Sequence, residues 1–257
     1  MTRAYSLGSA TIGRGALYGD IDLVHVKPVP HGSCDACALG QRIFYHISAL
    51  QEGRRQLPVG RRQPCMLVAP ESFYPFCITR YPELVELWGG ALDDEALLVI
   101  GAHVVQEDKQ YQAAVVMQKG LINKVYVKHH AVSFVEALPP RLQKYAWIAS
   151  WFVSDKVQWL HAGKGLLKEP GIVLDGDHYI MPFICSEFFF KCNSFKVWRH
   201  GMNFAHDKKM CMMVLINDSW FCGYFKELLR RYAQFMALFT GVPVVYVGHT
   251  KLMWLAS

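Results

Sequence analysis

Three side chains suited to nucleophilic catalysis each follow a short apolar run. Glu71, Lys128 and Cys185 all stand at the carboxyl end of such a run. A cysteine supplies a thiol nucleophile, a carboxylate can accept its proton, and an ammonium can hold the charge that develops on a substrate. In α/β folds, sites are built at this end of the strands. The residue types alone are weak evidence, because a lone cysteine after a strand is most often a small core residue.

The elements that must position these residues follow from apolar periodicity and turn chemistry. Apolar and β-branched runs predict strands at residues 21–26, 66–69, 96–105, 112–118, 121–127, 171–174, 178–184, 210–216 and, as the last strand, 244–247. Helical spacing predicts helices at residues 38–51, 81–92 and 225–239, and helix or helix with loop at 188–198. Turns at Lys119-Gly120 and Asp175–Asp177 predict hairpins.

This order of elements indicates a single α/β domain with a mixed sheet. We expect residues 1–19, which are rich in Gly and Ser, to be loosely ordered, and residues 20–257 to form the domain. A chain of 257 residues is long enough to bury a large core.

Four segments resemble motifs of the carbon–nitrogen hydrolase (nitrilase) superfamily. They are Ala-Pro-Glu-Ser at 69–72, Lys-His-His-Ala-Val-Ser-Phe-Val-Glu at 128–136, Phe-Ile-Cys-Ser-Glu at 183–187 and Asn-Asp-Ser-Trp-Phe at 217–221. Within the superfamily they are most similar to the apolipoprotein N-acyltransferase branch. That branch shows Pro-Glu-Ser/Thr, Lys-x-His-Leu-Val-Pro-Phe-Gly-Glu, Ile-Cys-Tyr-Glu and Asn-Asp-Ala-Trp-Phe in the same order.

The resemblance implies a four-layer α-β-β-α sandwich and a Glu-Lys-Cys triad. Cys185 would be the nucleophile that forms a thioester acyl-enzyme, Glu71 the general base and Lys128 the cation that stabilises the oxyanion. An unperturbed thiol, with a pKa of about 8.5, is only a few per cent thiolate at neutral pH, so a neighbouring base is needed to take its proton.

Supporting or substrate-binding roles are implied for Glu136, Ser186, Glu187, Asn217 and Trp220. The Ser186 N–H could donate to the oxyanion if the strand turns sharply there. The alternative for Glu136 is a solvated loop residue, and the alternative for Trp220 is core packing.

The sequence also departs from the branch. Ser-Phe-Val at 133–135 replaces Pro-Phe-Gly, Ser186 replaces an aromatic residue, and the helix before Pro243 lacks the branch's polar signature. The closing strands of the family are expected to be missing, so that the domain is short at its C-terminus.

The acyltransferase branch embeds this domain in a bundle of membrane helices, whereas this sequence has no apolar run of about 18 residues. We see no signal peptide either, so the expected location is cytoplasmic or peripheral to a membrane. The aromatic segment Trp147–Trp159 is suited to a peripheral membrane contact. Its alternative is an ordinary core helix and loop.

Composition excludes other classes of protein. With 52% hydrophobic and 19% charged residues, the chain is neither disordered nor fibrous. The net charge of +6 is scattered and no aromatic-interleaved basic stripe accompanies it, so no nucleic-acid partner is expected. Cys34 and Cys37 form the only Cys-x-x-Cys, and without a second pair we expect no metal and no cofactor.

Three functions remain open. The first is a thiol acyltransferase or amidohydrolase acting on an amide, nitrile or acyl-lipid substrate. The second is a conjugative-transfer (TraB-type) protein with a nitrilase-like domain, and the third is a non-catalytic scaffold that kept the fold. The resemblance also implies a homo-oligomer formed through the outer helices.

Overall fold

The computed structural model describes the strands and helices that carry the candidate residues. The described residues are 22–26, 47–48, 51–52, 55, 65–71, 77–91, 96–106, 109–129, 171–173, 177–189, 198–199, 202–203, 208–249 and 251–255. Residues 1–19, Cys34, Cys37, Glu136 and the Trp147–Trp159 segment lie outside them, so the predictions for these parts of the chain stay predictions.

The first sheet contains five strands in sequence order. They are β1 (Asp22–His25), β2 (Cys65–Ala69), β3 (Ala96–Gln106), β4 (Lys109–Gln118) and β5 (Leu121–Val127). β1, β2 and β3 are parallel, and β4 and β5 continue as antiparallel neighbours. β5 therefore runs in the direction of β2, and the two strands end at the same edge of the sheet.

The second sheet repeats this arrangement with its own five strands. They are β6 (Ile172–Val173), β7 (His178–Ile184), β8 (Lys209–Leu215), β9 (Val244–Val247) and β10 (Leu252–Leu255), in the order β10-β9-β8-β7-β6. β7, β8 and β9 are parallel, whereas β6 and β10 pair antiparallel at the two ends.

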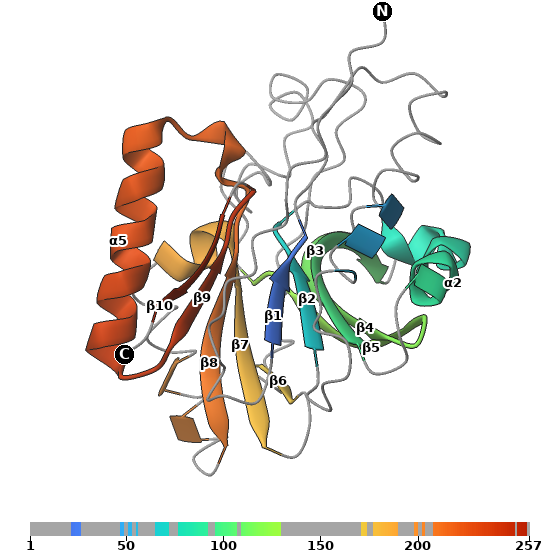
Figure 1. Cartoon of the computed structure of the whole chain (residues 1–257), viewed down its shortest axis with the longest axis horizontal. Helices are drawn as coiled ribbons and strands as arrows, with labels where there is room; N and C mark the ends of the chain where they lie inside the picture. Colours follow the sequence, from blue (N-terminus) through green and yellow to red (C-terminus); the bar gives the residue numbers. More distant parts are fainter. Residues whose placement is uncertain are drawn as a thin grey trace, which may run out of the picture.

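The two sheets face each other and one helix covers each outer face, so the described elements form four layers (Figure 1). Alternate side chains of each central strand point to opposite faces, as the pleat requires. Met66 and Val68 of β2 belong to the core between the sheets, and Leu67 and Ala69 belong to the core under the first helix. The sandwich therefore has three apolar cores.

The outer helices are α2 (Pro82–Ala91) and α5 (Gly223–Thr240). α2 buries Val85 and Trp88 against the first sheet. α5 buries Leu229, Ala233, Met236 and Ala237 against the second. Short 3-10 helices precede α2 (η1, Ile78–Arg80) and follow β7 and β8 (η2, Cys185–Phe189; η3, Asp218–Trp220). None of the helices among the described residues is long and apolar enough to cross a membrane.

The predicted strands and hairpins are confirmed, with two corrections. The strands divide between two mixed sheets rather than one, because apolar periodicity marks a strand but does not say which sheet it joins. The four-layer sandwich implied by the resemblance is the correct description. Val244–Val247 is not the last strand either, since Leu252–Leu255 pairs with it after a short turn. Of the predicted 38–51 helix, only residues 47, 48 and 51 are described, and they are helical.

The buried thiol of Cys211 predicts a loss of stability at alkaline pH. Cys211 lies in the core between the sheets, and burial raises its pKa from 9.0 to about 12. The unfolded thiol ionises first, so the stabilisation is complete below pH 9 and declines as pH rises toward 12. Over this range the free energy of unfolding falls by about 1 kcal/mol per pH unit. Urea unfolding of Cys211→Ala at stepwise pH values should show a flatter decline above pH 9 than the wild type.

The matched control is Cys222→Ala, which removes an exposed thiol. Its unfolding free energy should follow the wild-type pH dependence. Equal slopes for Cys211→Ala and the wild type would contradict the proposed cause.

Candidate active site

The candidate residues follow strands that end at the facing edges of the two sheets. Glu71 comes after β2, Lys128 after β5, Cys185 after β7 and Asn217 after β8. Parallel strands bring their carboxyl ends to one edge of a sheet, and stacking the two sheets places both edges together. Residues far apart in the sequence therefore meet here.

Glu71 and Lys128 form a buried ion pair. The Lys128 Nζ donates to Glu71 Oε1 at 3.1 Å, and the two side chains are only 2% and 5% exposed. Removing two charges from water is costly, and their attraction offsets this cost only where further hydrogen bonds satisfy them. The surrounding contacts of Glu71 provide such bonds.

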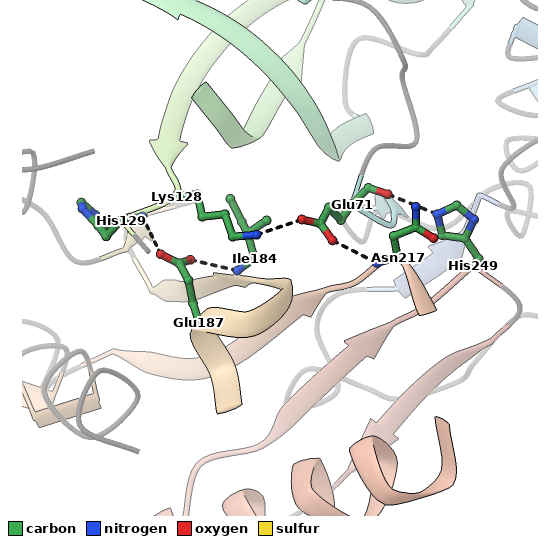
Figure 2. Close-up of polar contacts among 7 residues, drawn as sticks. All are labelled: Glu71, Lys128, His129, Ile184, Glu187, Asn217 and His249. Atoms are coloured by element: carbon green, nitrogen blue, oxygen red, sulfur yellow. Dashed lines mark hydrogen bonds and ion pairs between the residues drawn. The ribbon is translucent and has the colours of Figure 1, made fainter. Parts of the chain in front are cut away.

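Glu71 is held from the second sheet as well as from the first. The main-chain N–H of Asn217 donates to Glu71 Oε2 at 3.2 Å, and His249 Nε2 lies 3.2 Å from the Glu71 main-chain oxygen (Figure 2). Each carboxylate oxygen of Glu71 thus accepts one hydrogen bond, and each has a second lone pair. This leaves the carboxylate able to accept a proton while it stays in place.

Gly101 of β3 makes the close packing of Glu71 achievable. A Cβ at this position would lie 2.4 Å from the Glu71 Cα and 2.7 Å from the Pro70 carbonyl oxygen. Both contacts are with main chain, which cannot rotate aside as a side chain would. Only glycine therefore allows the chain carrying Glu71 to cross β3 at this distance.

The Glu187 carboxylate joins the ends of β5 and β7. It accepts from the main-chain N–H of His129 at 2.5 Å and of Ile184 at 3.0 Å. His129 follows Lys128, and Ile184 precedes Cys185, so this buried carboxylate fixes the two candidate residues relative to each other. Figure 2 shows Lys128 between the carboxylates of Glu187 and Glu71, with its ammonium directed to Glu71.

Cys185 lies at a sharp turn where β7 changes into η2. Its φ of 51° falls in the left-handed region, which costs a non-glycine residue about 1–3 kcal/mol. The side chain is half-buried and packs against both the core between the sheets and the core under α5. Strain of this kind persists only where the surroundings enforce it, and here the hydrogen bond from the Ile184 N–H to the Glu187 carboxylate, which spans Cys185, does so.

The other candidates occupy different positions. The Ser186 hydroxyl is buried and has no hydrogen-bond partner among the described residues. The Asn217 side chain does not reach Glu71 but caps η3, accepting from the Ser219 N–H at 3.3 Å. Trp220 is in η3, and its side chain is outside the described part.

Sequence reasoning assigned no role to Asp218 and His249. Asp218 is fully buried and accepts from the His249 N–H at 2.9 Å and from the Tyr246 hydroxyl at 3.4 Å. Its Oδ2 also lies 3.9 Å from the Arg230 guanidinium. The signal was available, because Asp218 follows β8 and His249 follows β9 at the same edge as the other candidates.

Burial and nearby charges raise the pKa values of two tyrosines at the site. Burial and then the charge of Glu187 raise the pKa of Tyr126. Burial, then the charge of Asp218 and, to a smaller extent, that of Cys185 raise the pKa of Tyr246. Cys185 is therefore within electrostatic reach of the Asp218–Tyr246 pair. Within the described part of the chain, no three His, Cys, Asp or Glu side chains are grouped to hold a metal ion.

Two curated proteins named apolipoprotein N-acyltransferase are similar in sequence to this chain. The protein from Sinorhizobium medicae (strain WSM419) is 26% identical over 208 residues, and that from Rhizobium meliloti (strain 1021) is 29% identical over 207 residues. Each similarity covers 75% of this chain and 36% of the relative, so the chain spans about a third of their length. No model of a known protein family matches the chain.

Solved structures share the fold. A glutamine-dependent NAD+ synthetase from Acinetobacter baumannii superposes with a TM-score of 0.57 at 14% identity, over 90% of this chain and 39% of that protein. A CN-hydrolase superfamily protein from Xanthomonas campestris, solved with an arsenic adduct in its active site, gives 0.53 at 15% identity, over 90% and 78%. The resemblance seen in the motifs is thus confirmed in sequence similarity and in fold.

Glu187 predicts a measurable contribution of the site to stability. In Glu187→Gln the amide NH2 group would face one of the two main-chain N–H donors, leaving a buried donor unsatisfied. We expect this to lower the free energy of unfolding by about 1–3 kcal/mol in urea titrations. Glu52→Gln is the control, because Glu52 forms an ion pair with Arg55 at 3.6 Å in which both side chains are exposed. A change there should stay below about 0.5 kcal/mol, and equal losses in the two variants would contradict a clamping role for Glu187.

Proposed function

We propose that this chain is a catalytic domain of the carbon–nitrogen hydrolase superfamily, related to apolipoprotein N-acyltransferases, that carries out acyl transfer or C–N bond hydrolysis through Cys185. The observation that supports this most directly is the buried Glu71–Lys128 ion pair at the sheet edge where β7 delivers Cys185. A buried ion pair is costly, and a purely structural domain would be as stable with apolar side chains there.

In the proposed reaction, Glu71 accepts the thiol proton while the Cys185 sulfur attacks the substrate carbonyl carbon. A C–S bond forms and the electron pair of the carbonyl π bond moves to oxygen. Lys128, an ammonium with three N–H donors of which the Glu71 bond takes one, stabilises that oxyanion. The sharp turn at Cys185 also lets the Ser186 N–H act as a second donor.

The tetrahedral intermediate then collapses to a thioester. The bond to the leaving amine or alcohol breaks, and the leaving group takes the proton held by Glu71. Water or an amine resolves the thioester by the same steps in reverse, transferring its own proton to Glu71 and restoring the thiol. Amides, nitriles and acyl lipids are the substrate classes that suit this chemistry. A nitrile would form a thioimidate, which water hydrolyses.

The charges around the site favour proton transfer during attack over a preformed thiolate. The carboxylates of Glu71, Glu187 and Asp218 contribute three negative charges around the site, against the positive charges of Lys128 and Arg230. A resting thiolate would add a further negative charge, which electrostatic repulsion disfavours. A neutral thiol with an adjacent carboxylate base avoids this repulsion until the substrate is in place.

The alternatives are less well supported. The curated relatives are named acyltransferases, and no observation favours a conjugative-transfer protein. A scaffold gives no reason for a half-buried cysteine in a strained turn at the sheet edge that also carries the buried Glu71–Lys128 pair. A lipid substrate reached through the Trp147–Trp159 segment remains a proposal, which liposome flotation of the wild type and Trp151→Ser would test.

Selective acylation of Cys185 tests the enzyme proposal. Incubation with an activated acyl ester such as p-nitrophenyl butyrate should add one acyl group to the protein by intact mass, located on Cys185 by peptide mapping. Cys185→Ala should abolish this adduct. Glu71→Gln keeps the shape of the side chain but removes the base, and it should slow acylation by roughly 100-fold or more.

Cys222 is the internal control, because its thiol is exposed and lies at the start of α5. Its alkylation by iodoacetamide should be the same in wild type and Glu71→Gln. Acylation of Cys185 that is as fast without the Glu71 carboxylate as with it, or absence of any acyl adduct on Cys185, would overturn the proposed function.

We also propose that the chain forms a homodimer through α5. The outward face of this helix carries six large apolar side chains that are 40–79% exposed: Tyr224, Phe225, Leu228, Phe235, Leu238 and Phe239. Such an apolar face on a surface helix marks an interaction site. The stacked rings of Phe235 and Phe239, 5.6 Å apart, make its C-terminal half continuous.

The spacing of these residues along α5 favours a second copy of the chain as the partner. The positions of the six apolar side chains are symmetric about the middle of the helix, which lies between Arg231 and Tyr232. An antiparallel pair of helices related by a two-fold axis there would place Leu228 opposite the partner's Phe235, and each remaining apolar residue opposite another. An isologous interface requires this self-complementarity.

The dimer is tested by sedimentation equilibrium. Wild type should associate reversibly, and Phe235→Glu should be monomeric because it buries a charge against an apolar partner. Leu121→Glu is the matched control, since Leu121 is also apolar and exposed but lies on β5. In the double variant Leu228→Cys with Phe235→Cys, oxidation should crosslink the two chains, whereas neither single variant should do so at these positions. A wild type that stays monomeric at every accessible concentration would contradict the dimer.

A further inference from the structure

The turn between β9 and β10 bridges the two sheets beside Glu71. His249 Nε2 lies 3.2 Å from the Glu71 main-chain oxygen, and His25 Nε2 of β1 lies 2.9 Å from the Gly248 oxygen. Because both acceptors are carbonyl oxygens, both ring nitrogens must be the donors. The turn itself is closed by a hydrogen bond from the Gly248 N–H to the Lys251 oxygen at 3.0 Å.

Asp218 fixes the position of this turn. Its Oδ1 accepts from the His249 main-chain N–H at 2.9 Å, and its Oδ2 accepts from the Tyr246 hydroxyl at 3.4 Å. The packing is tight, because a Cβ on Gly248 would lie 2.5 Å from Asp218 Oδ2. The guanidinium of Arg230, 3.9 Å away, offsets part of the charge of the fully buried carboxylate.

Two consecutive residues therefore hold Glu71 by different routes. Asn217 donates its main-chain N–H directly to the Glu71 carboxylate. Asp218 acts through His249, whose ring holds the main-chain carbonyl of Glu71. One end of β8 thus fixes both the backbone and the carboxylate of the same glutamate.

We infer that His249 is a positioning residue for Glu71. Its imidazole fixes the peptide plane that follows Glu71, and with it the direction in which the carboxylate leaves the main chain. The Nε2–H needed for this bond is present in the neutral tautomer protonated at Nε2 and in the imidazolium, so the contact does not depend on ionisation of the ring. The inference rests on the proposed role of Glu71 as the base. A displacement of about 1 Å in such a group can cost about 100-fold in rate.

The test measures the rate of Cys185 acylation by p-nitrophenyl butyrate in single and double variants. His249→Ala should slow acylation by about 10- to 100-fold, whereas His249→Gln, whose amide N–H reaches about as far as Nε2, should stay within a few-fold of wild type. His249→Asn keeps a polar side chain that is too short to reach Glu71, and it should behave like His249→Ala. It provides the readout if the alanine variant does not fold.

The double variant Glu71→Gln with His249→Ala separates positioning from a structural effect. If His249 acts through Glu71, the double variant should be no slower than Glu71→Gln alone. Multiplied losses, or a His249→Gln variant as slow as His249→Ala, would overturn the inference. If Glu71→Gln does not slow acylation, the proposed function itself fails. If Glu71→Gln slows acylation but His249→Ala and His249→Asn do not, only the role of His249 is wrong.

Discussion

The buried ion pair between Glu71 and Lys128 is the interaction around which the rest of the site is arranged. Its two members follow two strands of the first sheet, β2 and β5, that are not neighbours, and neither could be buried alone without a large cost in desolvation. The main-chain donor at Asn217 and the glycine at Gly101 allow the carboxylate to be both satisfied and closely packed. The site therefore depends on main-chain geometry as much as on the charged side chains.

The two sheets contribute different parts to this arrangement. The first sheet carries Glu71 and Lys128, and the second carries the candidate nucleophile and most of the residues that hold Glu71 in place. Hydrogen bonds at one edge cross between the two sheets, by way of Asn217, His249, Glu187 and His25. Asp218 and Tyr246 of the second sheet are thus linked through hydrogen bonds to Glu71 on the first.

Much of this could be predicted from the sequence, and the limits have physical causes. Apolar runs located the strands, and the Lys119-Gly120 turn, where both residues have positive φ, predicted its hairpin. Periodicity could not assign strands to two sheets, because that depends on long-range pairing. The strand at Leu252–Leu255 was missed because it is short and only partly buried. The motif resemblance pointed to Asn217, but a residue type does not reveal that the main-chain N–H of that residue makes the contact. The hydrogen-bond partners of the Asp218 carboxylate lie 28 and 31 positions away.

The distance along the chain between the contacting residues has a consequence for how the protein matures. His249 and Glu71 are separated by 178 positions and Asn217 and Glu71 by 146. Contacts this remote form late in folding, because a long loop must close before they stabilise anything. The two sheets must dock before the glutamate, the lysine and the cysteine share one environment. Under the proposed mechanism, a newly made or partly unfolded chain therefore holds an ordinary thiol, and Cys185 becomes reactive only with the completed fold.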